Sequence, residues 1–472
     1  MGEYDAVVVG SGPNGFSAAI TLARTGRKVL MLESKATIGG GMRSQEITLP
    51  GFVHDICSAI HPLTLISPFF KTIPFARLGL TWIYSPVEAA HPLDDQPAAL
   101  IYRSIAETAE AFDEDGRAYR RLFGTLDQQG DALYEELLSP LNIPPRHLIP
   151  LIMVGLPGLL PAAMLARRWF KTDRARAAFA GMAAHSILPL DTVGTAAFGL
   201  MLGLSAHKAG WVFPKGGAQQ IPNALALYFR ELGGEIVTDH PVHSMDDLPS
   251  APIVMLDTSP RMMARILGDR VPRWYQTILN RYRYGAGVFK VDYALSAPIP
   301  WKDPEVARAG TVHVGGTLDE IAESERVIGL GAHTDHPFIL LAQHSLFDTT
   351  RAPDGKHTAW AYCHVPNGST VDMLERFENQ IERFAPGFRD VVLARNIRNT
   401  VQLEEYNPNY IGGDINSGAQ DLLQQFTRPI PQFNPYATPV KGVYLCSSAT
   451  PPGGGVHGMS GYYAAKSALK SD

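Results

Sequence analysis

The sequence predicts an α/β fold in which a parallel sheet is interrupted by an inserted α+β domain built on a mixed or antiparallel sheet. Two observations come from the ends of the chain, where apolar strands at residues 4–9 and 442–445 each run into a glycine-rich turn and a helix. A third is a similar strand and glycine pattern at residues 213–256. Because parallel strands need long crossover connections, segments far apart in sequence can share one sheet.

The first element is a strand at residues 4–9, a β-branched apolar run typical of a parallel strand covered on both faces. Gly10, Gly12 and Gly15 follow with the spacing G-x-G-x-x-G. Gly10 permits a tight turn, Gly12 lets backbone N–H groups approach a pyrophosphate, and Gly15 lets a helix lie close to the strand. Pro13 falls near the first helical turn, where its missing N–H costs little.

A helix at residues 14–24 and a second strand at residues 28–32 complete this unit. The strand ends on Glu33, eighteen residues after Gly15, where the ribose hydroxyls of a dinucleotide need an acceptor. Strand, glycine turn, helix, second strand and terminal acid all agree, so the segment predicts a dinucleotide site. Asn14 and Ser34 belong to the same predicted set of contacts.

A glycine triplet follows at residues 39–41, and Arg43 comes directly after it. Such a run suits neither a helix nor a strand centre, but it allows a backbone to approach a ligand closely. A guanidinium nearby can bind anionic oxygens. We therefore expect Gly40, Gly41, Met42 and Arg43 to contact the cofactor.

The motifs GSGPNG, Glu33 and IGGGMRS together resemble the N-terminal signature of the flavin amine oxidase superfamily, in particular its phytoene desaturase and carotenoid isomerase-like branch. This resemblance implies a Rossmann-type, glutathione-reductase-like domain that binds FAD rather than NAD. In that family the first glycines hold the pyrophosphate, the acid holds the adenosine ribose, and the GG-x-R loop lies along the flavin.

Two later segments resemble the family's returns to the FAD domain. Residues 213–217 open a helix at 220–232 and a strand at 235–238, which implies that Val242 lies near the adenine. The last strand at 442–445 exits through Ser447 and Ser448, where many flavoproteins carry Gly-Asp, so a carboxylate contact to the ribityl chain is in question. The resemblance implies that the following helix directs its N-terminus at flavin oxygens. The predicted contacts from this segment are Ser448, Gly455, Val456, His457 and Met459.

These segments predict an FAD-binding domain made of residues 1–60, 210–260 and 436–472. Residues 61–209 and 261–435 then form the substrate domain, including a mainly helical apolar region at 104–209. Further strands are expected at 253–256, 286–295 and 358–365, and an amphipathic helix at 372–384.

Residues 150–166 carry no charge, and Arg167, Arg168, Trp169 and Lys171 follow within five positions. Prolines and glycines interrupt the run, so it is not a simple membrane span. Two interpretations stay open: a buried helical pair that closes a hydrophobic cavity, or a peripheral patch that dips into a lipid interface at residues 150–171. Both suit a hydrophobic substrate.

Composition restricts the remaining classes of function. The net charge is −5 with acids and bases interspersed, which argues against a nucleic-acid partner. Cys57, Cys363 and Cys446 lie far apart, so we expect neither a metal site nor a disulfide. The first strand begins at residue 4, which predicts a cytoplasmic protein, with membrane association an open alternative.

The leading hypothesis is an FAD-dependent oxidoreductase that moves a hydride between a hydrophobic, polyene or lipid-like substrate and flavin N5. His457 is the first candidate for an acid-base or orienting role, with capping of the last helix as its alternative. His185, among apolar residues, is the second candidate, although such histidines are more often satisfied core groups.

Three alternatives stay open. Reduced flavin on the same scaffold could isomerise or saturate a double bond. An amine oxidase often encloses its substrate between two aromatic rings, but the adjacent Tyr462 and Tyr463 on a helix point roughly 100° apart. The third is a lipid-binding carrier of the GDP dissociation inhibitor type, which lacks flavin. The sequence is compatible with a monomer or a homodimer.

Overall fold

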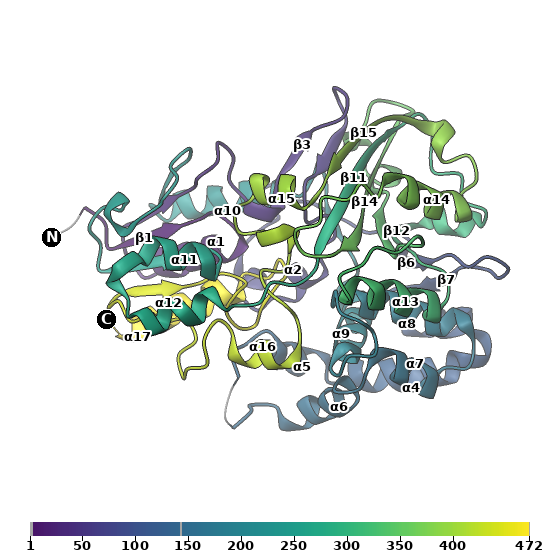
Figure 1. Cartoon of the computed structure of the whole chain (residues 1–472), viewed down its shortest axis with the longest axis horizontal. Helices are drawn as coiled ribbons and strands as arrows, with labels where there is room; N and C mark the ends of the chain where they lie inside the picture. Colours follow the sequence, from purple (N-terminus) through teal and green to yellow (C-terminus); the bar gives the residue numbers. More distant parts are fainter. Residues whose placement is uncertain (1–2, 142–143, 472) are drawn as a thin grey trace.

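The computed structural model describes residues 3–141 and 144–471 and contains two main sheets (Figure 1). The first is a five-stranded parallel sheet with the order β16-β10-β1-β2-β9. Its strands come from three distant parts of the chain, so the predicted α/β class with a Rossmann-type sheet is confirmed. Their bounds are β1 (Ala6–Val9), β2 (Val29–Leu32), β9 (Glu235–Val237), β10 (Ile253–Leu256) and β16 (Val443–Leu445).

The side chains of β1 alternate between two hydrophobic cores, one on each face of this sheet. Ala6 and Val8 join one core with Phe16 of α1 (Pro13–Ala23), whereas Val7 and Val9 join another with Met263 of α11 (Pro260–Leu267). Since successive side chains of a strand point to opposite faces, one apolar run serves both cores. The other helices of this part are α10 (Gln220–Glu231), α12 (Arg273–Asn280) and α17 (Met459–Ser471).

The second sheet has seven strands in the order β15-β11-β14-β13-β12-β6-β7. Only β12 and β6 pair in parallel; the other neighbours are antiparallel, which confirms the predicted mixed sheet. One face packs on α14 (Leu374–Phe384), where Phe377 and Ile381 are buried. The strands are β6 (Val87–His91), β7 (Ala99–Ile101), β11 (Gly287–Leu295), β12 (Ala309–Val314), β13 (Ile339–Ala342), β14 (His357–Val365) and β15 (Val392–Arg398).

A helical region lies beside the opposite face of this sheet, at the lower right of Figure 1. Small residues allow close packing there: a Cβ on Gly199 would be 2.7 Å from the Phe179 ring, and one on Gly203 would be 2.7 Å from Phe123. The helices are α3 (Ile105–Ala111), α4 (Gly116–Asp127), α5 (Gly130–Leu137), α6 (Leu148–Gly158), α7 (Ala162–Trp169), α8 (Asp173–Ala184), α9 (Thr195–Lys208) and α13 (Leu318–Gly329).

The uncharged stretch does form a helical pair, because α6 and α7 meet at a bend of 95°. Within the described residues no single helix is long and apolar enough to cross a membrane. Together, α6 and α7 have the length and the apolar composition of a membrane span, but they are bent at their junction. Val154 is buried, but Ile149 and Leu156 are 69% and 67% exposed. The pair is thus only partly buried, and one aliphatic face of α6 is left open.

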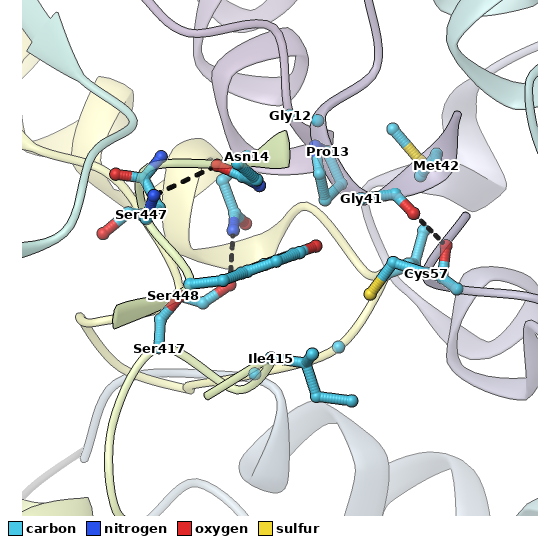
Figure 2. A pocket seen from close by; sticks show the side chains of 18 of the residues that line it. Gly12, Pro13, Asn14, Gly41, Met42, Cys57, Ile415, Ser417, Ser447 and Ser448 are labelled. Atoms are coloured by element: carbon cyan, nitrogen blue, oxygen red, sulfur yellow. Dashed lines mark hydrogen bonds between the residues drawn. The ribbon is translucent and has the colours of Figure 1, made fainter. Parts of the chain in front are cut away.

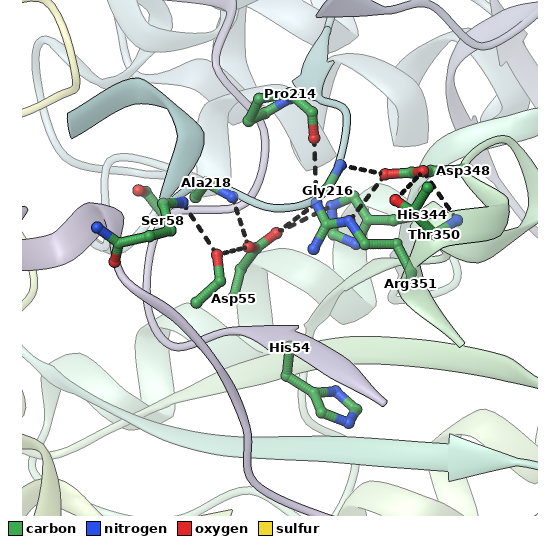
Figure 3. Close-up of polar contacts among 12 residues, drawn as sticks. His54, Asp55, Ser58, Pro214, Gly216, Ala218, His344, Asp348, Thr350 and Arg351 are labelled. Atoms are coloured by element: carbon green, nitrogen blue, oxygen red, sulfur yellow. Dashed lines mark hydrogen bonds and ion pairs between the residues drawn. The ribbon is translucent and has the colours of Figure 1, made fainter. Parts of the chain in front are cut away.

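Short elements connect the two sheets. A buried guanidinium, Arg351, links two of these connecting segments: its Nη2 lies 3.1 Å from Asp55 Oδ2 at the end of β4, and its Nε lies 3.1 Å from Asp348 Oδ2 in the loop after β13 (Figure 3). Ser44 Oγ and the N–H of Ala218 donate to the other oxygen of Asp55. The connecting elements are β3 (Ser44–Glu46), β4 (Val53–Asp55), α2 (Pro62–Ile66), β5 (Trp82–Ile83), β8 (Phe213–Pro214), α15 (Thr400–Tyr406) and α16 (Leu422–Thr427).

Candidate functional site

A cavity of about 440 Å³ contacts both the parallel and the mixed sheet. Most of the residues predicted to bind the cofactor line it, and so does His185. Gly15, His457 and Met459 do not line it. The predicted residues in its wall are Gly10, Gly12, Pro13, Asn14, Glu33, Ser34, Gly40, Gly41, Met42, Arg43, Val242, Ser448, Gly455 and Val456.

The glycine-rich turn is built as its spacing requires. Gly10 has φ +98°, and a Cβ on Gly15 would lie 2.1 Å from the carbonyl oxygen of Gly10, so α1 packs directly on the end of β1. Asp257, at the carboxyl end of β10, accepts a hydrogen bond from the N–H of Gly15 at 2.9 Å. Burial, together with the charge of the nearby Glu33, raises the pKa of Asp257 to about 7. The sequence places Asp257 at a strand end that favours ligands, but its contact with the glycine turn is a tertiary feature.

Glu33 lines the cavity and is held by the backbone around it. Its Oε2 accepts from the N–H of Ser11 at 3.1 Å, and its Oε1 accepts from the N–H of Lys35 at 3.0 Å. Ser11 Oγ also donates to Glu33 and accepts from the N–H of Gly39. The acid therefore has a fixed orientation and connects the first turn with the glycine triplet.

Arg43 supplies positive charge to the same wall. Its Nε donates to the carbonyl oxygen of Gly40 at 2.9 Å, and its guanidinium lies 4.4 Å from the centre of the Tyr406 ring. Tyr406 Oη donates to the same carbonyl oxygen. Over residues 3–141 and 144–471, no carboxylate lies within ion-pair distance of Arg43, so this buried cation is available to an anionic ligand.

The C-terminal segment closes the cavity opposite the glycine triplet. Figure 2 shows Asn14, Ser447 and Ser448 on one side and Gly41, Met42 and Cys57 on the other. Asn14 Nδ2 donates to Ser448 Oγ at 3.2 Å, which ties α1 to the exit of β16. Ser448 therefore places a hydroxyl group in the cavity wall where β16 ends.

His457 turns away from the cavity. Its Nδ1 accepts from the N–H of Met459 at 3.0 Å, at the start of α17, and its Nε2 donates to the carbonyl oxygen of Gly453 at 3.2 Å. Burial lowers its pKa to about 4. Both ring nitrogens are engaged with backbone, which matches the helix-capping alternative for this residue. Its catalytic role stays a prediction.

Several buried polar atoms in the cavity wall have no hydrogen-bond partner within the described residues. Because an unpaired buried polar group costs about 1–3 kcal/mol, a cluster of them at one cavity indicates a polar ligand. Their positions beside the glycine turn, near Asp257 and on the mixed sheet fit a long dinucleotide such as FAD. These atoms are Asn14 Oδ1, both ring nitrogens of His61, Thr258 Oγ1, Thr311 Oγ1 and Trp360 Nε1.

The other end of the cavity is apolar and aromatic. Trp360 and Tyr362 project from β14 into it, with ring centroids 5.1 Å apart and planes at 86°. His185, at the end of α8, lines the same cavity, with its ring centroid 5.5 Å from that of Trp211, and Tyr462 and Tyr463 are absent from the wall. The remaining apolar wall residues here are Phe198, Met201, Leu202, Trp211 and Leu340.

Sequence reasoning missed a buried ion pair next to this aromatic pair. Lys290 and Asp292 lie two positions apart on β11, so their side chains are on the same face of the sheet. Their cross-strand neighbours on β14 are Tyr362 and Trp360, respectively. Lys290 Nζ donates a hydrogen bond to Asp292 Oδ2. Burial lowers the pKa of Lys290. Two charged residues two positions apart inside a nine-residue apolar strand were the available signal.

Comparisons with known proteins bear on this site. The model of the NAD(P)-binding Rossmann-like domain matches residues 8–71. The "Pyridine nucleotide-disulfide oxidoreductase domain-containing protein 2" of Rattus norvegicus is 26% identical over 98% of this chain and 93% of its own length. The 4,4'-diapophytoene desaturase (4,4'-diapolycopene-forming) of Methylomonas sp is 25% identical over 51% of this chain and 48% of its own length.

Among solved structures, a variant of putrescine oxidase superposes with a TM-score of 0.64, at 17% identity, over 99% of both chains. At this identity the likeness shows the fold alone. The chain therefore has a Rossmann-like domain at its N-terminal end, and its overall fold is similar to that of putrescine oxidase.

Proposed function

We propose that this chain is an FAD-dependent oxidoreductase that transfers a hydride between a hydrophobic substrate and flavin N5. The observation that carries the proposal is one cavity that joins the glycine-rich dinucleotide cradle to an apolar, aromatic end. The resemblance of its motifs to the phytoene desaturase-like branch, and the partial similarity to a diapophytoene desaturase, support a polyene or lipid-like substrate.

Each part of the wall has a defined task in this proposal. The N–H groups at the start of α1 and the cation of Arg43 would hold the diphosphate, and Glu33 would accept from a ribose hydroxyl. Asn14 and Ser448 would contact the middle of the cofactor. When bound, FAD supplies the hydride acceptor, while the protein orients the substrate and excludes water.

His185 would act at the substrate end. It lines the cavity, and burial lowers its pKa to about 3, so it is neutral near pH 7 and can form a hydrogen bond with a substrate. His457 has no comparable access, since both of its ring nitrogens contact backbone.

One observation favours amine oxidation as a second candidate. Trp360 and Tyr362 form a nearly perpendicular aromatic pair in the cavity, a surface suited to an amine by cation–π attraction. Reduced flavin could also isomerise or saturate a double bond on the same scaffold. Anaerobic turnover by the pre-reduced enzyme without net flavin oxidation would favour isomerisation over oxidation.

We also propose that α6 and α7 make a peripheral contact with lipid. Ile149, Ile152 and Leu156 are exposed on α6, and Arg167 and Arg168 follow on the exposed side of α7. Aliphatic side chains would enter the interface while the cations stay at headgroup level. The helices also pack on α9, whose residues Phe198, Met201 and Leu202 line the cavity. A lipid-like substrate would therefore have a short path from the interface.

The first test is the visible absorption spectrum of the purified protein, followed by extraction and mass analysis of what it releases. Released FAD and the absorption bands of oxidised flavin are the expected result. The Arg43→Gln variant should retain less FAD, whereas Arg308→Gln, at an exposed ion pair, should retain the normal amount. A protein that stays colourless after incubation with FAD would overturn the proposal and favour the carrier of the GDP dissociation inhibitor type.

A further inference from the structure

Three arginines lie on the exposed face of α4, in the helical region at the lower right of Figure 1. Arg117, Arg120 and Arg121 are three and four positions apart, so their side chains share one face of the helix. The other face packs into the core, and its buried residues are Tyr119, Leu122, Phe123 and Leu126. Helix α4 therefore presents a basic face to solvent.

This basic face continues onto α7. The guanidinium carbon of Arg121 lies 6.0 Å from the centre of the Trp169 ring, which is half-buried at the end of α7. Arg168 precedes Trp169 in sequence and is exposed as well. The two helices thus bring together four exposed cations around one indole ring. We call Arg117, Arg120, Arg121 and Arg168 the arginine cluster.

The charge of the arginine cluster is not compensated by carboxylates. Over residues 3–141 and 144–471, none of its four guanidinium groups forms an ion pair. Acids at both ends of α4 and beside α7 have other cations as partners. These pairs are Asp113–Arg174, Glu114–Lys171, Asp127–Lys208 and Asp319–Arg167. The cluster is therefore a local excess of positive charge in a chain whose net charge is −5.

An aliphatic surface adjoins the arginine cluster, because α4 packs against α6 and α6 leads directly into α7. Met164 of α7 is 54% exposed, one turn before Arg168. The segment 137–172, which contains both α6 and α7, has no acidic residue. Cations beside exposed aliphatic side chains, without acids, are what an anionic lipid surface attracts. The exposed aliphatic residues of α6 are Leu148, Ile149, Ile152 and Leu156.

We propose that the arginine cluster binds the headgroups of anionic phospholipids while the aliphatic face of α6 enters the bilayer. The inference rests on the proposed lipid contact of α6 and α7, and it adds a further helix, α4, and a preference for negatively charged lipid. Guanidinium groups match phosphate oxygens, and Trp is enriched at membrane–water interfaces. A bilayer satisfies both surfaces at once, whereas a nucleic acid would leave the aliphatic face in water.

Co-sedimentation of the full-length protein with vesicles tests the charge preference. Phosphatidylcholine vesicles that contain phosphatidylglycerol should bind it more tightly than vesicles of phosphatidylcholine alone. Arg121→Gln and Arg168→Gln should each weaken binding to the anionic vesicles about fivefold, the effect of one cation near such a surface. Arg273→Gln is the matched control, since it removes the same charge beside the exposed Trp274 on α12, at the other side of the molecule (Figure 1), and should bind normally. Equal losses in all three variants would overturn the proposal.

Tryptophan fluorescence provides the second measurement, because it locates the contact on the protein surface. Phosphatidylglycerol with brominated acyl chains quenches tryptophans that reach the bilayer. At saturating vesicle concentration, these lipids should quench part of the emission of the unsubstituted protein. Trp169→Phe should lose this quenching, whereas Trp274→Phe, which removes an exposed tryptophan outside the proposed contact, should retain it. Unchanged quenching in Trp169→Phe would overturn the proposal.

The outcomes separate this inference from the proposed function. Equal binding to both kinds of vesicle would overturn the headgroup preference but retain the aliphatic contact of α6, and binding to neither would overturn both. Binding of a short DNA duplex that Arg121→Gln weakens, without binding of anionic vesicles, would assign the cluster to nucleic acid and overturn the proposal. Neither measurement depends on flavin. A protein without FAD that prefers anionic vesicles would therefore refute the proposed redox function and retain this inference.

Discussion

Asp257 Oδ2 accepts a hydrogen bond from the backbone N–H of Gly15 at 2.9 Å, at the N-terminus of α1. This is the helix end that would bind the diphosphate of a dinucleotide. The carboxyl group and the diphosphate thus share one group of donors, and burial raises the pKa of Asp257 to about 7. We therefore expect the charge of Asp257 to control the affinity of this end of the cavity for an anion.

FAD affinity should decrease between about pH 7 and about pH 9, because ionised Asp257 repels the diphosphate. The decrease should reach at most about tenfold per pH unit, the limit for linkage to one proton. Asp257→Asn should remove this dependence, while Asp319→Asn, at an exposed position, should keep it. Titration of FAD into the cofactor-free protein and into each variant, at several pH values, measures these affinities. An equally steep profile in Asp257→Asn would contradict the assignment.

Asp257 should also make folding stability depend on pH. Its pKa in the folded protein lies above the usual value of about 3.9, so protonation favours the folded state. The contribution is complete below about pH 4 and is lost as the pH rises through about 7. Urea unfolding between these values should show a loss on the order of 2 to 4 kcal/mol that Asp257→Asn lacks. A loss of the same size in the variant would place its origin elsewhere.

Gly15→Ala should destabilise the protein and weaken FAD binding, because the new Cβ would lie 2.1 Å from the carbonyl oxygen of Gly10. We expect a loss of about 2 kcal/mol or more in the free energy of unfolding, as for overpacking in a rigid core. Gly124→Ala is the matched control: Gly124 is in α4 and has no atom within 4 Å of its added Cβ. It should stabilise the protein by about 0.5 to 1 kcal/mol. Equal effects of the two substitutions would be inconsistent with this packing.

Arg351→Met should lower the free energy of unfolding by about 3–5 kcal/mol, since it leaves Asp55 and Asp348 buried without their cation. Arg351 also holds the pKa of Asp55 below its usual range, although burial alone would raise it. Arg326→Met breaks an exposed pair with Glu323 and should cost less than about 1 kcal/mol. Chemical denaturation compares the two. Similar losses would mean that the buried network contributes no more than a surface pair.

Leu156→Asp should reduce binding to liposomes that contain anionic lipid, because Leu156 is 67% exposed on the aliphatic face of α6. The free energy of unfolding should change by less than about 0.5 kcal/mol, as expected for a surface position. Leu330→Asp changes a leucine that is 72% exposed after α13 and should bind liposomes normally. Co-sedimentation with vesicles measures both. If neither the unsubstituted protein nor the variants bind vesicles, the lipid contact is wrong.

The sequence alone was sufficient to predict the α/β class and the glycine-rich turn that begins the site. Gly10, Gly12, Glu33 and the glycine triplet are close in sequence, so their chemistry follows from local geometry: a turn, a helix N-terminus and a strand end. The later returns to the parallel sheet carry the same local signals. The predicted domain boundaries and cofactor contacts remain predictions, although the cavity wall contains most of those contacts.

Only the tertiary structure decided which distant groups face the cavity. Asp257 meets Gly15 across 242 positions, and His185 meets His313 across 128. Apolar periodicity shows that a residue is buried, but it does not show which partner it meets, because the partner depends on how the two sheets and the helices pack. For this reason three features became visible only in the folded chain: the Lys290–Asp292 pair, the edge-on rings of Trp360 and Tyr362, and the position of His457 outside the cavity wall.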